Sequence, residues 1–189
     1  MDRRNVLKTL GVAASAGAGT LVGASSWAQA SQTIKLGFIS SLSGAQAPLG
    51  QPMLLGAQIT VDQVNKAGGV NGRKLELVIR DDKAKPADAT VAARELAGSG
   101  MNMMLGVVSS AVALAISAML EQEKALLITC AAHSEKLTKE NFVRNYFRVT
   151  DNPYMRERAL AKMAAQRYAS VDRWTGIIPD HEYGRTTWG

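Results

Sequence analysis

Residues 34–82 read IKLGFISSLSGAQAPLGQPMLLGAQITVDQVNKAGGVNGRKLELVIRDD, and this stretch decides the fold. A short apolar strand runs into a loop rich in Gly, Ser and Pro, and a helix and a tight turn then lead to a second apolar strand. Such a unit places its loop at the carboxyl end of a parallel sheet, where open α/β folds bind ligands. The loop has no nucleotide-binding fingerprint, so the segment favours a small-molecule receptor over a cofactor enzyme.

Strand and helix patterns alternate along the rest of the chain. Apolar runs predict strands at 34–39, 74–80, 103–108, 125–128, 146–149 and 174–178. Helical spacing of apolar residues predicts helices at about 50–66, 86–98, from 110 onward and from about 153 to 169. Repeated β-α units predict an α/β fold with a doubly wound parallel sheet. Right-handed crossovers then bring the βα loops to one edge, namely 40–50, 81–86, 107–111, 129–134 and 179–184.

The first 30 residues have the three parts of a secretory signal. Arg3-Arg4 precedes a weakly apolar run rich in Ala and Gly, and Ala28-Gln29-Ala30 has the form of a cleavage site. The paired arginines predict the twin-arginine type, cleaved after Ala30. An uncleaved membrane anchor is the weaker alternative, because a span needs about 20 strongly apolar residues. We therefore expect a periplasmic mature chain without stable membrane insertion.

Charge and cysteine content exclude several classes of protein. The net charge is +6, but no cluster of basic residues occurs and no aromatics are interleaved with basic ones, so a nucleic-acid partner is not expected. Cys130 is the single cysteine, which rules out an internal disulfide. We predict that Cys130 is a small buried side chain. The alternative, a reactive thiol, would use His133 three residues away.

Ser109-Ser110 is the best candidate for a binding site. A serine just before a helix caps it, and the N–H groups of the first helical turn attract anions. A ligand carboxylate could accept hydrogen bonds from the Ser110 hydroxyl and from these N–H groups. The loop at 129–134 lies on the same edge and could add main-chain groups at Ala131 and Ala132. A helix cap without any ligand is the alternative interpretation.

Signatures of catalysis are absent from the sequence. It contains no G-x-G-x-x-G, no phosphate-binding G-x-x-x-x-G-K-[ST] and no G-x-S-x-G. With two histidines and one cysteine, a His/Cys metal site is not expected either. Asp81-Asp82 could suggest paired carboxylates, but neighbours on a strand point to opposite faces, which predicts a solvated strand end. We therefore predict no catalytic residue, no metal and no cofactor.

The order and spacing of several short motifs across 33–189 identify a resemblance. They are Gly37-x6-Gly44 with Leu49-Gly50, Gly56-Ala57, NKAGGVNG at 65–72, Asp81-Asp82, Gly106-x-x-Ser109-Ser110, Ala131-Ala132 and Tyr183-Gly184. Together they resemble the periplasmic solute-binding proteins of branched-chain amino acid ABC transporters, of the leucine/isoleucine/valine-binding type.

The resemblance implies a type I periplasmic binding protein-like lobe and a set of ligand contacts. Ser110, beside Ser109, would bind a ligand carboxylate, and Ala131 and Ala132 would contribute main-chain contacts. His133 would stand where many members have a hydroxyl residue that contacts the ligand. Leu49 would stand where some members place a Tyr, and Tyr183 would pack over the ligand. The large His133 and the apolar Leu49 suggest a ligand with an extra acidic or aromatic group.

The resemblance also implies a longer protein, because members of the family have two lobes. Residues 31–170 would form the first lobe, and 171–189 would form the start of a second lobe that is largely missing. The resemblance places the usual acidic partner for a ligand ammonium group in the missing part. The implied function is to capture an amino acid or related small carboxylate and deliver it to a membrane permease. We expect this chain alone to bind such a ligand weakly or not at all. An exported α/β enzyme and a sensory domain of the same fold are the alternatives.

Overall fold

The computed structural model describes residues 33–188, and their centre is a five-stranded parallel sheet. The strands are β1 (Ile34–Ser40), β2 (Leu75–Asp81), β3 (Met103–Gly106), β4 (Leu126–Thr129) and β5 (Tyr146–Arg148). They pair in the order β2-β1-β3-β4-β5, and every pairing is parallel. The predicted doubly wound parallel sheet is confirmed.

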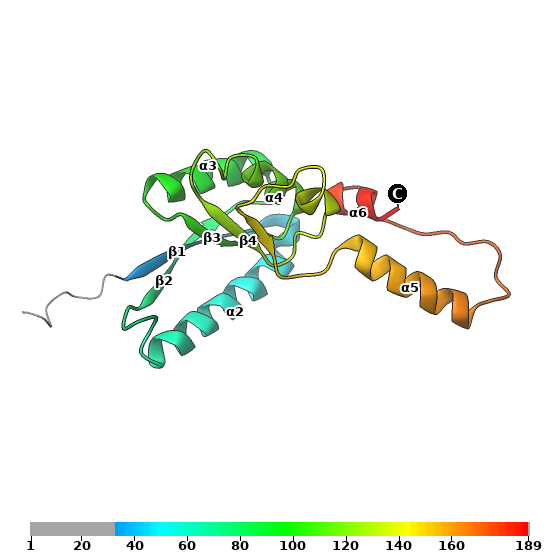
Figure 1. The fold of residues 1–189 in the computed structure, drawn as a ribbon, viewed down its shortest axis with the longest axis horizontal. Helices are drawn as coiled ribbons and strands as arrows, with labels where there is room; N and C mark the ends of the chain where they lie inside the picture. The colour runs from blue at the N-terminus through cyan, green and yellow to red at the C-terminus, as the bar shows by residue number, and fades with distance from the viewer. Residues whose placement is uncertain (1–32, 189) are drawn as a thin grey trace, which may run out of the picture. The chain divides into compact units, whose positions relative to one another are not determined.

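Helices cover both faces of this sheet. Figure 1 shows α2 (Ala47–Lys66) on one face, and α3 (Pro86–Gly98) and α4 (Ser110–Ser117) side by side on the other. The change of face follows from the strand order, because the chain leaves β1 toward β2 and then returns past β1 to β3. The loops after β1 and β3 therefore flank the point where the strand order reverses, which is where open α/β sheets bind ligands.

The core lies between the sheet and the α3–α4 layer. Ala89, Ala93 and Leu96 of α3 are fully buried, as their helical spacing predicts, and they join the same apolar cluster as Met104 and Leu127 of the sheet. Full burial of a Leu or Met side chain contributes roughly 1.5–3 kcal/mol. This packing holds β1, β3 and β4 rigidly, and thereby fixes the loops at their carboxyl ends.

β3 ends two residues earlier than its apolar run predicts. Gly106 has a φ of +111° and Val107 a φ of +62°, so the backbone leaves the extended conformation at this point. The Val107 N–H nevertheless donates to the carbonyl of Ile39 on β1, at 2.7 Å. An apolar run cannot reveal this change of direction, and it carries the chain from β3 toward Ser109 and Ser110.

The chain after β5 differs from the prediction. Helix α5 (Pro153–Arg167) begins as expected, because the Asn152 Oδ1 accepts from the Met155 N–H at 2.9 Å. The strand predicted at 174–178 is wrong: the segment is exposed, has no strand partner among residues 33–188, and its Ile177 is 103% exposed. The expected loop at 179–184 instead runs into helix α6 (Glu182–Trp188), which contacts α4 and α5.

The two carboxyl groups at the end of β2 lie in different environments, and the prediction of a solvated strand end is wrong for Asp82. Its side chain is fully buried, and its Oδ1 accepts from the Ser41 Oγ at 2.6 Å and from the Ala84 N–H at 2.8 Å. The Oδ1 of the half-buried Asp81 accepts from the N–H groups of Leu42 and Lys83, both at 2.9 Å. Together the two carboxylates hold the start of the loop after β1.

These environments shift the two pKa values in opposite directions. Desolvation raises the pKa of the Asp82 carboxyl above 3.8, and the charge of the neighbouring Asp81 raises it further. The hydrogen bonds from Ser41 and Ala84 lower this pKa but do not cancel the rise. Desolvation is also the largest single influence on the pKa of Asp81 and raises it, but hydrogen bonds from Ser43, Lys83 and Leu42 together outweigh desolvation and lower that pKa.

We expect Asp82→Asn to change the pH dependence of stability with a defined sign. Because the folded chain binds the Asp82 proton more tightly than the unfolded chain, this group stabilises the fold at low pH and that contribution is lost as the pH rises through the raised pKa. The wild type should therefore gain stability relative to Asp82→Asn between about pH 7 and pH 4 in urea unfolding. Asp81→Asn is the matched control and should show the opposite trend, because the wild type loses stability relative to it only as the pH falls below about 3.8. Parallel profiles for the wild type and Asp82→Asn would contradict the raised pKa.

Candidate functional site

A cavity of about 400 Å³ lies where the loops after β1, β3 and β4 meet the segment before α6. Six of the predicted site residues line it: Leu49, Ser109, Ser110, Ala131, His133 and Tyr183. The seventh, Ala132, is fully buried in the apolar core and is not among the lining residues. The structure thus brings together residues from four separate parts of the sequence, as expected for loops at one edge of a parallel sheet.

Ser110 is placed to donate a hydrogen bond into this cavity. Ser109 occupies the N-cap position of α4, but its hydroxyl makes no capping bond, contrary to the simple capping expectation. The hydroxyl oxygen of Ser110 instead accepts from the N–H of Ser134, at 3.1 Å. Because that bond occupies the oxygen as an acceptor, the hydroxyl hydrogen remains available for a ligand oxygen.

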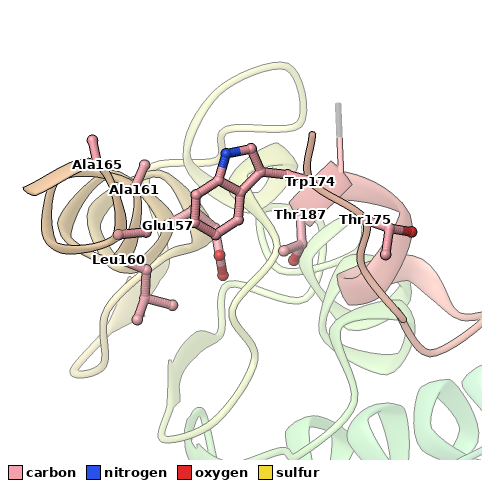
Figure 2. Close-up of a pocket in the computed structure, with 8 residues that line it drawn as sticks. Glu157, Leu160, Ala161, Ala165, Trp174, Thr175 and Thr187 are labelled. Carbon is pink, nitrogen blue, oxygen red and sulfur yellow. The ribbon is translucent and has the colours of Figure 1, made fainter. Parts of the chain in front are cut away.

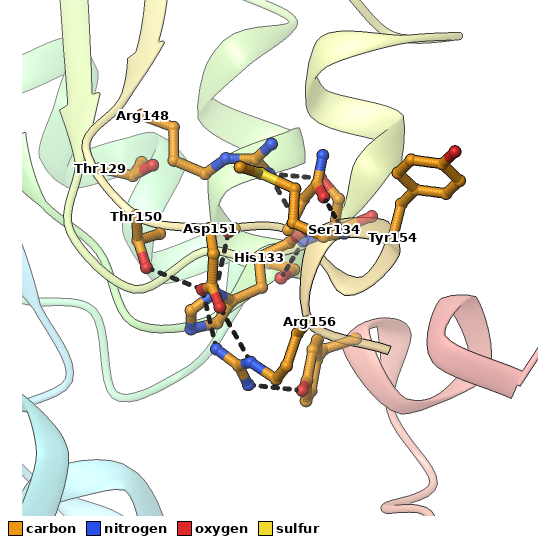
Figure 3. A network of polar contacts seen from close by, with 12 residues as sticks. Thr129, His133, Ser134, Arg148, Thr150, Asp151, Tyr154 and Arg156 are labelled. Carbon is orange, nitrogen blue, oxygen red and sulfur yellow. Dashed lines mark hydrogen bonds and ion pairs between the residues drawn. The ribbon is translucent and has the colours of Figure 1, made fainter. Parts of the chain in front are cut away.

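A chain of polar contacts holds His133 through Asp151 and Arg156 (Figure 3), and Arg156 extends this chain to Tyr183. The Nδ1 of His133 lies 3.0 Å from the Oδ1 of Asp151, and Arg156 donates to both oxygens of Asp151, at 2.9 and 2.8 Å. Arg156 also donates to the Tyr183 hydroxyl at 2.8 Å. The rings of His133 and Tyr183 are tilted at 5.4 Å between centroids. This chain therefore fixes two cavity walls that come from separate loops.

Arg156 controls the charge of this contact chain. Its hydrogen bonds hold the pKa of the Asp151 carboxyl below 3.8, and the bond to Asp151 raises the pKa of Arg156 itself. Both groups are therefore charged near neutral pH, and a ligand in the cavity meets an arginine that is already paired.

Sequence reasoning did not identify several residues that line the cavity: Gln46, Met53, Val108, Arg156, His181 and Glu182. Arg156 had a signal, because a positive charge in the first turn of a helix opposes the helix dipole and suggests a specific anionic partner. Asp151, directly before the helix, is that partner. Glu182 had no such signal, since α6 itself was not predicted.

The wall nearest α2 is apolar. Leu49 is 62% exposed, and Met53 lies one helical turn further along the same helix. Gly50 is buried between them, and a Cβ there would lie 2.0 Å from the Ser41 carbonyl oxygen. Only glycine permits this close approach of α2 to the loop after β1. An apolar ligand group could pack on Leu49 and Met53 while a polar group reaches Ser110.

Arg148 supports the loop that carries His133 and Ser134. It stands at the end of β5 and donates through Nη1 to the carbonyls of both residues, at 3.0 Å each. Charge-assisted bonds to main-chain oxygens fix a loop more firmly than apolar packing alone. Arg148 does not line the cavity but positions residues that do.

We expect Arg148→Ala to lower the free energy of unfolding by about 1.5–3 kcal/mol, the usual range for hydrogen bonds to charged groups. Urea unfolding measures this loss. The exposed Arg144 is the matched control, since it makes no hydrogen bond or ion pair within residues 33–188, and Arg144→Ala should change stability by less than about 0.5 kcal/mol. Equal losses in the two variants would contradict the role of Arg148.

A second cavity, of about 520 Å³, lies away from the sheet edge, against α5 (Figure 2). Its walls include Leu160, Ala161, Ala164 and Trp174. Glu157, Thr175 and Thr187 add polar groups to these walls, but Leu160 is 47% and Trp174 59% exposed, and the cavity lies away from the switch point of the sheet. Ligand sites usually combine apolar walls with a few placed polar groups, and the cavity at Ser110 meets that description better.

The remaining chemistry-bearing side chains do not form a reactive site. Cys130 is exposed, so the prediction of a buried side chain is wrong, and desolvation raises the pKa of its thiol, which disfavours the reactive thiolate. Residues 33–188 contain no group of three or more His, Cys, Asp or Glu side chains that could hold a metal ion. Within the same range, no helix combines the length and the apolar character needed to cross a membrane.

Comparison with known proteins gives a consistent family. A family model described as periplasmic binding protein matches residues 33–188. The leucine-, isoleucine-, valine-, threonine- and alanine-binding protein of Pseudomonas aeruginosa is 31% identical over 165 residues, covering 87% of this chain and 43% of that protein. The Leu/Ile/Val-binding protein BraC3 of Rhizobium johnstonii is 32% identical over 80% of this chain and 41% of its own length. The chain thus spans about two fifths of these curated relatives.

Solved structures give the same picture. The branched-chain amino acid substrate-binding protein LivJ of Streptococcus pneumoniae, in complex with isoleucine, superposes with a TM-score of 0.66 at 29% identity, covering 71% of this chain and 38% of that one. An ABC transporter solute-binding protein of R. palustris, in complex with 4-hydroxybenzoate, has a TM-score of 0.72 at 24% identity, covering 82% and 41%. At that identity the second likeness concerns the fold alone.

Proposed function

Because this chain belongs to the periplasmic binding protein family, we propose that it forms the first ligand-binding lobe of a solute receptor for an ABC transporter. Its ligand is an amino acid or a related small carboxylate, which the receptor delivers to a membrane permease. Membership of a binding-protein family argues against the alternative of an exported enzyme.

One observation carries this proposal: the Ser110 hydroxyl, whose oxygen already accepts from the Ser134 N–H, lines the same cavity at the switch point of the sheet as the apolar side chains Leu49 and Met53. A ligand could place its carboxylate against the Ser110 hydroxyl and pack its side chain on Leu49 and Met53, which lie on different walls of the cavity. The paired Arg156 adds positive charge on one wall without being free to bind a ligand on its own.

The proposal extends to the parts of the protein outside this cavity. A twin-arginine signal that ends at Ala30 would export the chain to the periplasm, although these residues lie outside those that the structure describes. Residues 171–189 would begin a second lobe, and the exposed apolar side chains of Trp174 and Ile177 are suited to packing in it. Closure of two lobes on a ligand is what gives such receptors high affinity, so the first lobe alone should bind weakly.

Thermal unfolding against a panel of branched-chain, acidic and aromatic amino acids, amides and aromatic carboxylates tests the proposal. Ligands at millimolar concentration are needed, because binding to the native state raises stability by RT ln(1 + [L]/Kd). We expect a saturable rise in the unfolding temperature with one chemical class. No shift with any class would contradict ligand binding by this lobe on its own and would mean that the second lobe is essential.

A further inference from the structure

We propose that Asp82 is a buried proton switch that acts through Ser41 on the Leu49 wall of the cavity at the sheet edge. The inference rests on the proposed function, because the regulated cavity is the one that would hold the ligand. Asp82 directly follows β2, its side chain is fully buried, and it is not among the residues that line the cavity. A change in its charge can therefore regulate the site without any contact with a ligand.

The surroundings of Asp82 favour the protonated carboxyl group. Its Oδ1 accepts two hydrogen bonds, but its buried Oδ2 has no hydrogen-bond partner among residues 33–188. A buried charge with unmet hydrogen bonds costs far more free energy than a neutral carboxyl group. The neighbouring Asp81 has the same charge and disfavours ionisation further, while Lys83 is paired with Asp88 of α3 at 3.4 Å. Asp82 therefore keeps its proton to a higher pH than an exposed aspartate does.

The turn after Asp82 depends on the same side chain. Lys83 and Ala84 have φ values of +51° and +57°, a region that residues other than glycine rarely adopt. Such a conformation persists only where the surrounding structure holds it. The Ala84 N–H donates to the Asp82 Oδ1, and the Lys85 N–H donates to the Asp82 carbonyl, both at 2.8 Å. A shift of Asp82 on ionisation is thus opposed by a strained turn on one side and is transmitted to Ser41 on the other.

Ser41 connects Asp82 to the start of α2. Its Oγ lies 2.6 Å from the Asp82 Oδ1 and 3.4 Å from the Oε1 of Gln46, which lines the cavity. A hydroxyl has a single hydrogen to donate, so these two oxygens compete for it. The main chain of Ser41 also supports Gly50, where a Cβ would lie 2.0 Å from the Ser41 carbonyl oxygen. Leu49 precedes Gly50 in the first turn of α2 and must therefore follow any displacement of Ser41.

Loss of the Asp82 proton as the pH rises is the event that moves this wall. Ionisation puts a second negative charge beside Asp81 and leaves the buried Oδ2 charged and without a donor. It also strengthens the hydrogen bond from Ser41 to Asp82 at the expense of Gln46, because charge-assisted hydrogen bonds are shorter and stronger. The cavity therefore has two arrangements of its α2 wall, one for each protonation state of Asp82.

An NMR titration of the full chain between about pH 4 and pH 8 tests the switch. In the wild type we expect the Ala84 amide and the Leu49 methyl groups to titrate with one shared midpoint above 3.8. In Asp82→Asn this midpoint should be lost from both signals. Both proteins keep the other histidine and carboxylate side chains that line the cavity, namely His133, His181 and Glu182. Those groups therefore cannot produce the difference.

Two further variants separate the route from the proton. Ser41→Ala should abolish the Leu49 response and keep that of Ala84, with a higher midpoint, because the Ser41 hydrogen bond lowers the pKa of Asp82. Asp81→Asn should keep both responses and lower their midpoint, because it removes a neighbouring negative charge. An unchanged Leu49 titration in Asp82→Asn would overturn the switch, and a Leu49 titration that survives in Ser41→Ala would overturn its route.

The titration follows the protein without any ligand, which separates this inference from the proposed function. A result that overturns the switch leaves ligand binding in the cavity intact. Failure of every compound in the thermal unfolding panel would contradict ligand binding by this lobe on its own, whereas the Leu49 titration would still decide whether Asp82 moves the cavity wall.

Discussion

Replacing Gly106 with Ala is expected to lower the free energy of unfolding by about 3 kcal/mol or more, among the largest effects of any single substitution. Gly106 has a φ of +111°, in a region that side chains other than glycine rarely adopt. A Cβ there would also lie 2.3 Å from the carbonyl oxygen of Ile39. Relief of this overlap would separate β3 from β1 at the base of the cavity, since the adjacent Val107 N–H bonds the same oxygen.

Gly56→Ala is the control for this prediction. Gly56 lies inside α2, and a Cβ there would meet no atom within 4 Å. Alanine should therefore stabilise the chain by about 0.5–1 kcal/mol through its better helix propensity. Chemical unfolding of both variants measures the two changes. A loss below about 1 kcal/mol for Gly106→Ala would show that the β1–β3 junction adapts easily.

Replacing Ser110 with Ala is expected to have the largest effect on ligand binding, a loss of about tenfold to a hundredfold in affinity for carboxylate ligands. The variant removes the hydroxyl hydrogen that we assign to the ligand. It also leaves the buried N–H of Ser134 without its acceptor, which should cost about 1–3 kcal/mol of stability. Titration and urea unfolding on the same protein separate the two effects.

The neighbouring Ser109 provides the comparison. It lies at the N-cap of α4, but its hydroxyl makes no capping bond, so Ser109→Ala should change stability by less than about 0.5 kcal/mol. Its effect on ligand affinity should be smaller than that of Ser110→Ala. Equal affinity losses in both variants would mean that the hydroxyl of Ser110 has no special role in binding.

The sheet and the first half of the cavity were predictable because they follow from local patterns. Apolar runs broken by Gly and Ser gave the five observed strands, and the order of strand and helix determines which loops share an edge. Ser110, Ala131 and His133 each follow a strand of this sheet. Their convergence therefore needs no information on side-chain packing, although the resemblance to a family was required to assign them roles.

The other half of the site depends on tertiary contacts. An apolar run such as 174–178 becomes a strand only beside another strand, and no such neighbour is present among residues 33–188. Arg156 and Glu182 enter the cavity because α6 packs on α4 and α5. Likewise, burial of Asp82 depends on how the loop after β1 folds over it. None of these contacts leaves a periodic pattern in the sequence.

The two hydrogen bonds that Ser134 makes affect how the effects of substitutions combine. Its amide contacts Ser110 and its hydroxyl contacts Glu182, so a shift of this one residue alters both ends of the cavity. The effects of changing Ser110 and Glu182 should therefore not add, since residues in one network typically couple by 0.5–3 kcal/mol, on the order of the individual effects. The cavity walls that carry Ser110 and Glu182 would then respond to substitution as a single cooperative unit.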